Sequence, residues 1–314
     1  MTMIISSQRN LPDRYSVANM LAYHLRDPEG VSERGTPDTL DKAFVYQGAP
    51  SLLRLELSPD TVTASWTLIP PASAIKQESP PGLPPAASLE TILANMVDRM
   101  LGLQQDIQAF EKSHATHPEL GPLITRQQGL RVAATATPFE ALAWAIIGQQ
   151  ISVKAAVAIR RRLIQATGPR LPGGLWGHPD ACQLATQPPQ RLLDAGLSQA
   201  KTRALLTVSQ MVANDTLPLD TWLQSAQPDW PAWRDTLLDV RGIGPWTVDY
   251  TMLRGYGWLD GSLHGDVAVR RALAHLLGCE TPVTAAFTRQ WLNRFTPWKA
   301  LVGAHLWASN KLQA

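Results

Sequence analysis

The chain has 314 residues, 45% of them hydrophobic, and its 28 lysine and arginine residues nearly balance its 26 aspartate and glutamate residues. A globular chain of this length buries about three quarters of its unfolded surface, which is enough for two or three subdomains. Its two cysteines, Cys182 and Cys279, exclude a disulfide framework and a four-cysteine iron–sulfur cluster. With no signal peptide and no apolar run of spanning length, the composition predicts a soluble, cytoplasmic protein without membrane contact.

Short alternating segments in the first third of the chain predict a small antiparallel sheet. Residues 1–12 are polar and lack periodicity, so we expect a loose start, and residues 15–33 predict a short helix and turn. Apolar and polar residues then alternate in the manner of half-buried strands over residues 42–47, 51–57 and 61–68.

A proline-rich stretch separates this sheet from a helical remainder. The prolines of residues 70–85 predict a loop, after which Ser88 is expected to cap a helix that runs to residue 103. Helical patterns continue from about residue 105 to the end, interrupted by a second loop at 168–179. The predicted fold class is α+β, with an N-terminal antiparallel β-sheet domain over residues 1–118. Two helical subdomains that flank a cleft are expected over residues 119–314.

The most informative stretch of the chain spans residues 237–272. An apolar helical run is predicted to stop at Gly242, and Pro245 suits the first turn of a second helix. Gly242 and Gly244 predict a turn with positive φ. The unpaired N–H groups at the start of the second helix, together with the helix dipole, would bind a phosphate without a basic side chain.

An aspartate follows this hairpin at a position that suits a helix N-cap. Asp266 stands after His264 and Gly265 and before an amphipathic helical run. At a helix N-terminus the dipole and free N–H groups stabilise its negative charge.

Together these residues resemble the signature of the helix-hairpin-helix DNA glycosylase superfamily. The signature combines a hairpin with a Gly or Pro and then an Asp about twenty residues later, and its elements here are Leu238, Gly242, Ile243, Gly244, Thr247 and Asp266. Residues 137–163, 196–218 and 297–311 are similar to segments of one branch, the DNA-3-methyladenine glycosylase II family. The resemblance covers roughly residues 120 to 310.

The resemblance implies an enzyme that flips alkylated purines out of double-stranded DNA and excises them, leaving an abasic site. A cationic base such as 3-methyladenine is attracted to aromatic faces, and its glycosidic bond is already weakened. Asp266 would stabilise the positive charge that develops on the sugar and would orient the attacking water. Superfamily members that also nick the strand carry a lysine where this chain has Trp246, so a monofunctional enzyme without lyase activity is expected.

The same resemblance assigns the remaining site residues. The flipped base would lie among aromatic side chains, namely Trp246, Tyr250, Trp307, Tyr23 and Trp144. Gln150, with Ile151 beside it, would fill the gap left in the duplex.

Contacts to the DNA backbone are expected from the hairpin and from basic residues near it. Gly242, Gly244 and Arg241 would bind phosphate. Two basic clusters could converge into one face that contacts DNA: Lys154, Arg160, Arg161 and Arg162 near one segment, and Arg241, Arg254, Arg270 and Arg271 around the hairpin and the aspartate. No cofactor is expected for the chemistry. The family resemblance alone implies a monovalent cation held by the backbone carbonyls of Leu238, Val240 and Ile243. A monomer is expected.

Two other functions remain open from the sequence. An enzyme of the same fold could act on oxidised or deaminated bases, because an aromatic pocket accepts several purines. A non-catalytic protein that binds damaged DNA is the second alternative, because hairpins often serve only as phosphate clamps. The presence of Asp266 at the signature spacing argues against this last option.

Overall fold

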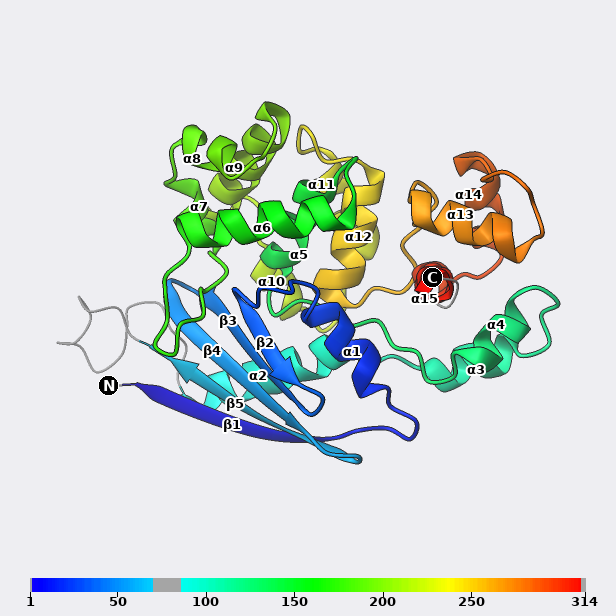
Figure 1. Cartoon of the computed structure of the whole chain (residues 1–314), viewed down its shortest axis with the longest axis horizontal. Coiled ribbons are helices and arrows are strands. Elements are labelled where there is room, and N and C mark those ends of the chain that lie inside the picture. The colour runs from blue at the N-terminus through cyan, green and yellow to red at the C-terminus, as the bar shows by residue number, and fades with distance from the viewer. Residues whose placement is uncertain (1, 70–85, 312–314) are drawn as a thin grey trace.

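The computed structural model describes residues 2–69 and 86–311, and shows a five-stranded antiparallel sheet beside a helical region (Figure 1). The predicted proline-rich loop at 70–85 lies outside the described residues. The α+β fold class predicted from the sequence is confirmed. Within the described residues no helix is long and apolar enough to cross a bilayer.

The sheet has the strand order β1-β5-β4-β3-β2. In chain order its strands are β1 (Met3–Asn10), β2 (Glu33–Thr36), β3 (Thr39–Tyr46), β4 (Ala49–Leu57) and β5 (Thr61–Leu68). The three strands predicted from alternation correspond to β3, β4 and β5. In the central pair the buried residues Leu53 and Trp66 lie opposite each other.

The prediction of a loose start was wrong, because Met3–Asn10 forms the edge strand β1. Its eight residues pair with β5 from Met3 opposite Leu68 to Asn10 opposite Thr61. Only Ile5 of this strand is buried. An edge strand held mainly by backbone hydrogen bonds carries little apolar alternation, so its sequence did not reveal it.

Two helices pack on the sheet. The short helix predicted after the N-terminus is α1 (Val17–His24), which is capped by the Ser16 hydroxyl. Helix α2 (Ala86–Leu101) begins two residues before the predicted cap at Ser88 and ends two residues before residue 103. Its fully buried side chains share the sheet core: Leu89, Leu93, Val97 and Met100.

The helical region has two apolar cores. One is built around α5 (Pro138–Gly148), α6 (Val153–Thr167), α7 (Ala181–Ala185), α8 (Pro189–Asp194), α9 (Gln199–Ala213), α10 (Leu219–Leu223), α11 (Trp230–Leu238) and α12 (Pro245–Tyr256). The other contains α3 (Ile107–His114), α4 (Leu120–Arg126), α13 (Val267–Leu276), α14 (Ala285–Asn293) and α15 (Lys299–Lys311). Figure 1 shows α13, α14 and α15 to one side of α12, with α3 and α4 below them.

The packing of helix α3 is relevant to the position of the domain boundary. Its buried residues Ile107 and Phe110 pack in the same core as α15 and not with the sheet. By packing, α3 therefore belongs with the C-terminal helices. The predicted boundary between residues 118 and 119 stays a prediction.

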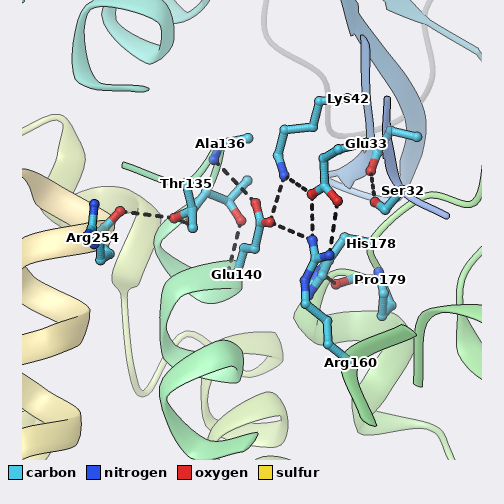
Figure 2. A network of polar contacts seen from close by, with 12 residues as sticks. Ser32, Glu33, Lys42, Thr135, Ala136, Glu140, Arg160, His178, Pro179 and Arg254 are labelled. Carbon is cyan, nitrogen blue, oxygen red and sulfur yellow. Dashed lines mark hydrogen bonds and ion pairs between the residues drawn. The ribbon is translucent and has the colours of Figure 1, made fainter. Parts of the chain in front are cut away.

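A buried ionic network joins the sheet to the first helical core (Figure 2). Lys42 Nζ on β3 lies 2.6 Å from Glu33 Oε1 on β2 and 2.7 Å from Glu140 Oε1 on α5. Arg160 on α6 binds Glu33 through both terminal nitrogens and reaches Glu140 at 3.0 Å. Burial alone would raise the pKa of Glu140, but the neighbouring Lys42, with further help from His178 and Arg160, lowers it to about 2. Two carboxylates thus balance two cations inside the protein.

Candidate active site

The predicted hairpin connects α11 to α12. Helix α11 ends at Leu238, four residues before the predicted stop at Gly242. Gly242 has a φ of +92°, as predicted, whereas Gly244 has a φ of −102° and forms the N-cap of α12, so its predicted positive φ was wrong. A Cβ added at Gly244 would meet no atom within 4 Å, so open space lies at the start of this helix. Pro245 occupies the first turn of α12, as predicted.

The Asp266 carboxylate is held by four donors from three helices. As predicted, it caps α13: Oδ1 accepts from the backbone N–H of Ala268 at 2.8 Å and of Val269 at 3.0 Å. The indole N–H of Trp307 on α15 donates to Oδ1 at 3.1 Å, and that of Trp246 on α12 donates to Oδ2 at 2.9 Å. Oδ1 is saturated by these bonds, while Oδ2 retains a free lone pair.

A cavity of 1470 Å³ opens beside this carboxylate and the hairpin. Its wall includes Asp266 and all five of the predicted aromatic residues, namely Trp246, Tyr250, Trp307, Tyr23 and Trp144. The Tyr250 ring centroid lies 5.3 Å from that of Trp246 and 6.1 Å from that of Trp307. Burial raises the pKa of Tyr250 to about 12, so its hydroxyl keeps its proton at neutral pH.

Two arginines contact the aromatic wall, and the sequence had not singled out Arg26. The Arg26 guanidinium carbon lies 3.9 Å from the ring centroid of Trp144 and 4.4 Å from that of Tyr23. Arg254 approaches the Tyr23 ring to 4.2 Å and the Trp307 ring to 5.5 Å. The wall of the cavity is therefore both aromatic and cationic.

The predicted wedge residues lie at the rim of the same cavity, between α5 and α6. Gln150 is exposed and has a φ of +55°, which is uncommon for a residue with a side chain. Ile151 beside it is 38% exposed. The neighbouring Gln149, which the sequence interpretation passed over, donates through Nε2 to the Gly242 carbonyl at 3.0 Å and to the Thr247 hydroxyl at 2.9 Å. Its amide fastens this loop to the hairpin.

Several arginines judged able to contact DNA bind other protein groups. Arg160 is 3% exposed, so that expectation was wrong for it: the side chain neutralises buried carboxylates. Arg161 pairs with Asp27 and Glu29, and three others donate to carbonyl groups: Arg162, Arg254 and Arg270. Lys154, Arg241 and Arg271 are exposed. Arg271 lines the cavity.

The predicted cation ligands are main-chain carbonyls of the hairpin turn. The Val240 carbonyl accepts a hydrogen bond from the Ile243 N–H at 3.0 Å, which leaves it one lone pair. Ligation through Leu238, Val240 and Ile243 stays a prediction. Across the described ranges, no cluster of three or more His, Cys, Asp or Glu side chains suits a metal.

The hairpin and its aspartate lie within a segment that matches a known family of proteins. Residues 143–297 match the HhH-GPD superfamily of base excision DNA repair proteins, so the chain carries a domain of that superfamily. The predicted superfamily is confirmed.

The chain is also similar to individual named proteins. Over 225 residues the chain is 28% identical to DNA-3-methyladenine glycosylase 2 of Escherichia coli, an alignment that covers 71% of this chain and 74% of that protein. It is 29% identical over 216 residues to a probable bifunctional transcriptional activator/DNA repair enzyme AlkA of Mycobacterium tuberculosis. That match covers 67% of this chain but only 41% of the mycobacterial protein.

Solved structures share the whole fold. The 3-methyladenine DNA-glycosylase of Archaeoglobus fulgidus superposes with a TM-score of 0.78 at 17% identity, over 98% of this chain and 99% of that one. An 8-oxoguanine glycosylase/lyase of Clostridium acetobutylicum, solved with DNA, gives a TM-score of 0.68 at 13% identity, over 99% of this chain and 98% of that one. At such identities the likeness concerns the fold, which glycosylases of different specificity share.

Proposed function

We propose that this chain is a monofunctional DNA glycosylase that excises alkylated purines of the 3-methyladenine and 7-methylguanine type. The observation that carries the proposal is the Asp266 carboxylate, fixed by two indole N–H groups at the edge of an aromatic cavity beside the hairpin. The name of the E. coli relative supports the same activity, and the name of the M. tuberculosis relative describes a probable DNA repair enzyme. Double-stranded DNA is the proposed partner.

The hairpin would hold the DNA backbone through main-chain groups. The N-terminus of α12 offers free N–H groups, and the open space at Gly244 admits a phosphate. Exposed Arg241 and Arg271 add positive charge beside it. A monovalent cation bound by the carbonyls of residues 238, 240 and 243 would supply one further contact to phosphate.

The flipped nucleotide would leave a gap that the exposed loop between α5 and α6 can fill. Gln150 projects from a backbone of positive φ, with Ile151 beside it. Gln149 ties this loop to the hairpin, so the wedge and the phosphate contact keep a constant spacing. A base turned into the cavity would then stack against Trp246 and Tyr250.

Bond breaking would need little more than a fixed negative charge. As the base departs, positive charge develops on the deoxyribose, and an ionised Asp266 stabilises it without reorienting. The free lone pair of Oδ2 can accept a hydrogen bond from the attacking water. Trp246 has no amine to form a Schiff base with the sugar, so the abasic site would be left intact.

Replacement of Asp266 by Asn tests the proposal, because Asn keeps the shape and loses the charge. We expect release of 3-methyladenine and 7-methylguanine from methylated duplex to fall by about 100-fold or more while duplex affinity changes little. If the variant excises both bases at the normal rate, Asp266 is only a helix cap and not a catalytic residue. Borohydride should trap no covalent complex with the unmodified protein, and trapping would refute the monofunctional assignment.

A panel of duplexes that each carry one modified base, assayed for release of the free base, decides between this function and the remaining candidates. Excision of only oxidised or deaminated bases would favour a glycosylase of the same fold that acts on those bases. Binding without release of any base would favour a damage-recognition protein.

A further inference from the structure

Exposed apolar side chains gather at the mouth of the cavity. Among the described residues six large hydrophobic side chains are exposed, and three of them line this cavity: Ile151, Val153 and Val267. Val153 is 67% exposed and Val267 is 60% exposed. Apolar side chains scattered singly over a surface need no explanation, but several at one site mark a contact surface. Ile151 belongs to the wedge loop, so the two valines are the members of this group without a role.

The two valines begin two different helices. Val153 is the first residue of α6, after the Ser152 cap, and Val267 is the first residue of α13, after Asp266. Figure 1 shows α6 and α13 on opposite sides of α12, the helix that follows the hairpin. Both helix starts are held by a side-chain cap, so each valine projects from a fixed backbone.

An exposed cation accompanies each valine. Lys154 follows Val153 directly. Arg271 lies four residues after Val267, on the same face of α13, and also lines the cavity. Across residues 2–69 and 86–311 no carboxylate forms an ion pair with either cation. Each of the two helix starts therefore presents one apolar side chain and one unpaired positive charge.

This combination matches the backbone of a DNA strand. Such a strand alternates anionic phosphates with deoxyribose rings, whose carbon-bound faces are the apolar part of the backbone. A valine beside a cation can therefore contact a sugar and its neighbouring phosphate together. Both valines border the cavity that would receive the flipped base. A protein bound to them would cover that cavity, whereas DNA that delivers a base must pass over them.

We propose that Val153 and Val267 bind the apolar faces of the deoxyriboses on the two sides of the flipped nucleotide, while Lys154 and Arg271 bind the adjoining phosphates. The inference rests on the proposed glycosylase function and adds a binding surface to it. Contact between apolar faces removes water from both and depends little on salt. Non-specific binding to DNA depends mainly on charge, so the valines favour the complex in which a nucleotide has entered the cavity.

The test measures affinity for two duplexes of one sequence over a range of salt concentrations. One duplex is undamaged and the other carries a single tetrahydrofuran residue, a stable analogue of an abasic site. In Val153→Ser and in Val267→Ser we expect affinity for the tetrahydrofuran duplex to fall by about 5- to 10-fold, because the apolar contact is lost. Affinity for the undamaged duplex should stay at the wild-type value.

The double variant and the salt dependence sharpen the test. Because the two valines lie on separate helices, the double variant should lose the product of the two single effects. The slope of log affinity against log salt concentration should stay at the wild-type value in all three valine variants, since no phosphate contact is removed. Arg271→Met should instead weaken binding to both duplexes and reduce that slope by about one.

Ile4→Ser is the matched control. Ile4 on β1 is 66% exposed, like the valines, but does not line the cavity, so affinity for both duplexes should be unchanged. Thermal unfolding of every variant should resemble that of the unmodified protein, because each replaced side chain is exposed.

Unchanged affinity of the folded double variant for the tetrahydrofuran duplex would overturn the inference and leave the glycosylase function intact. An equal loss of affinity for both duplexes would also overturn it, because such a contact does not depend on a flipped nucleotide. Failure of the unmodified protein to release any base from methylated duplex would overturn the proposed function itself.

Discussion

Loss of Lys42 should destabilise the protein in a way that depends on pH. The ammonium group is 1% exposed and bridges Glu33 and Glu140 inside the network that joins the sheet to α5 and α6. In Lys42→Met, two buried carboxylates would share only the Arg160 guanidinium. Breaking a buried ion pair by removing one partner costs about 3–5 kcal/mol.

The cost of protonating one of the two buried carboxylates accounts for the lower end of that range. The variant can relieve its excess charge by protonating one carboxylate, which from an ordinary pKa of 4.5 costs about 1.4 × (7 − 4.5), or about 3.5 kcal/mol, at pH 7. The folded variant then holds a proton that the unfolded chain releases above pH 4.5, so its stability falls as pH rises. The deficit relative to wild type should therefore shrink by about 1.4 kcal/mol for each pH unit from 7 to 5.

Urea denaturation at pH 7, 6 and 5 measures this deficit. The exposed Lys112→Met serves as the control and should change stability by less than about 0.5 kcal/mol. Adding Glu140→Gln to Lys42→Met restores charge balance with Arg160 and Glu33, and should recover part of the loss and abolish its pH dependence. A deficit below about 1 kcal/mol that does not vary with pH would refute the reasoning.

Three other expectations follow from the geometry. Trp246→Phe keeps an aromatic ring but removes the indole N–H and its 2.9 Å bond to Asp266, so single-turnover excision should slow by about 10- to 100-fold with duplex affinity unchanged; an unaltered rate would contradict a positioning role. Gly242→Ala, at a φ of +92°, should cost about 1–2 kcal/mol in thermal unfolding, whereas Gly244→Ala should fold normally and weaken duplex binding in a filter assay. Burial lowers the pKa of His24 to about 3, of His178 to about 4 and of His305 to about 3. Between pH 6.5 and 4 these histidines therefore take up protons in the unfolded chain but not in the folded one, and the free energy of unfolding should fall as pH falls. A free energy of unfolding that does not change over this range would contradict the reasoning.

The parts of the site that sequence reasoning found are those with local signatures. Asp266 was recognisable because an N-cap precedes its helix directly, and Gly242 and Pro245 because a turn and a first helical turn demand those residue types. The spacing between hairpin and aspartate then carried the family resemblance. Each of these features depends on a few consecutive residues.

The parts that were missed depend on partners far away in the chain. Glu33 and Arg160 are 127 residues apart in sequence, and nothing near Arg160 indicates that it is buried. Arg26 and Gln149 likewise matter only through what surrounds them in space. Strand β1 escaped notice because its stability comes from backbone pairing, which leaves no mark on side-chain type.

The Asp266 carboxylate accepts hydrogen bonds from helices α12, α13 and α15, so its position depends on how far folding has proceeded during synthesis. Trp307 is supplied by the last helix that the structure describes, so a ribosome would have finished almost all of the described chain before that indole could engage. A nascent or clipped polypeptide lacking α15 would lose the Trp307 donor and also the buried side chains that α15 contributes to the core shared with α13, the helix that Asp266 caps. The position of Asp266 is therefore fixed only after the last described helix has packed.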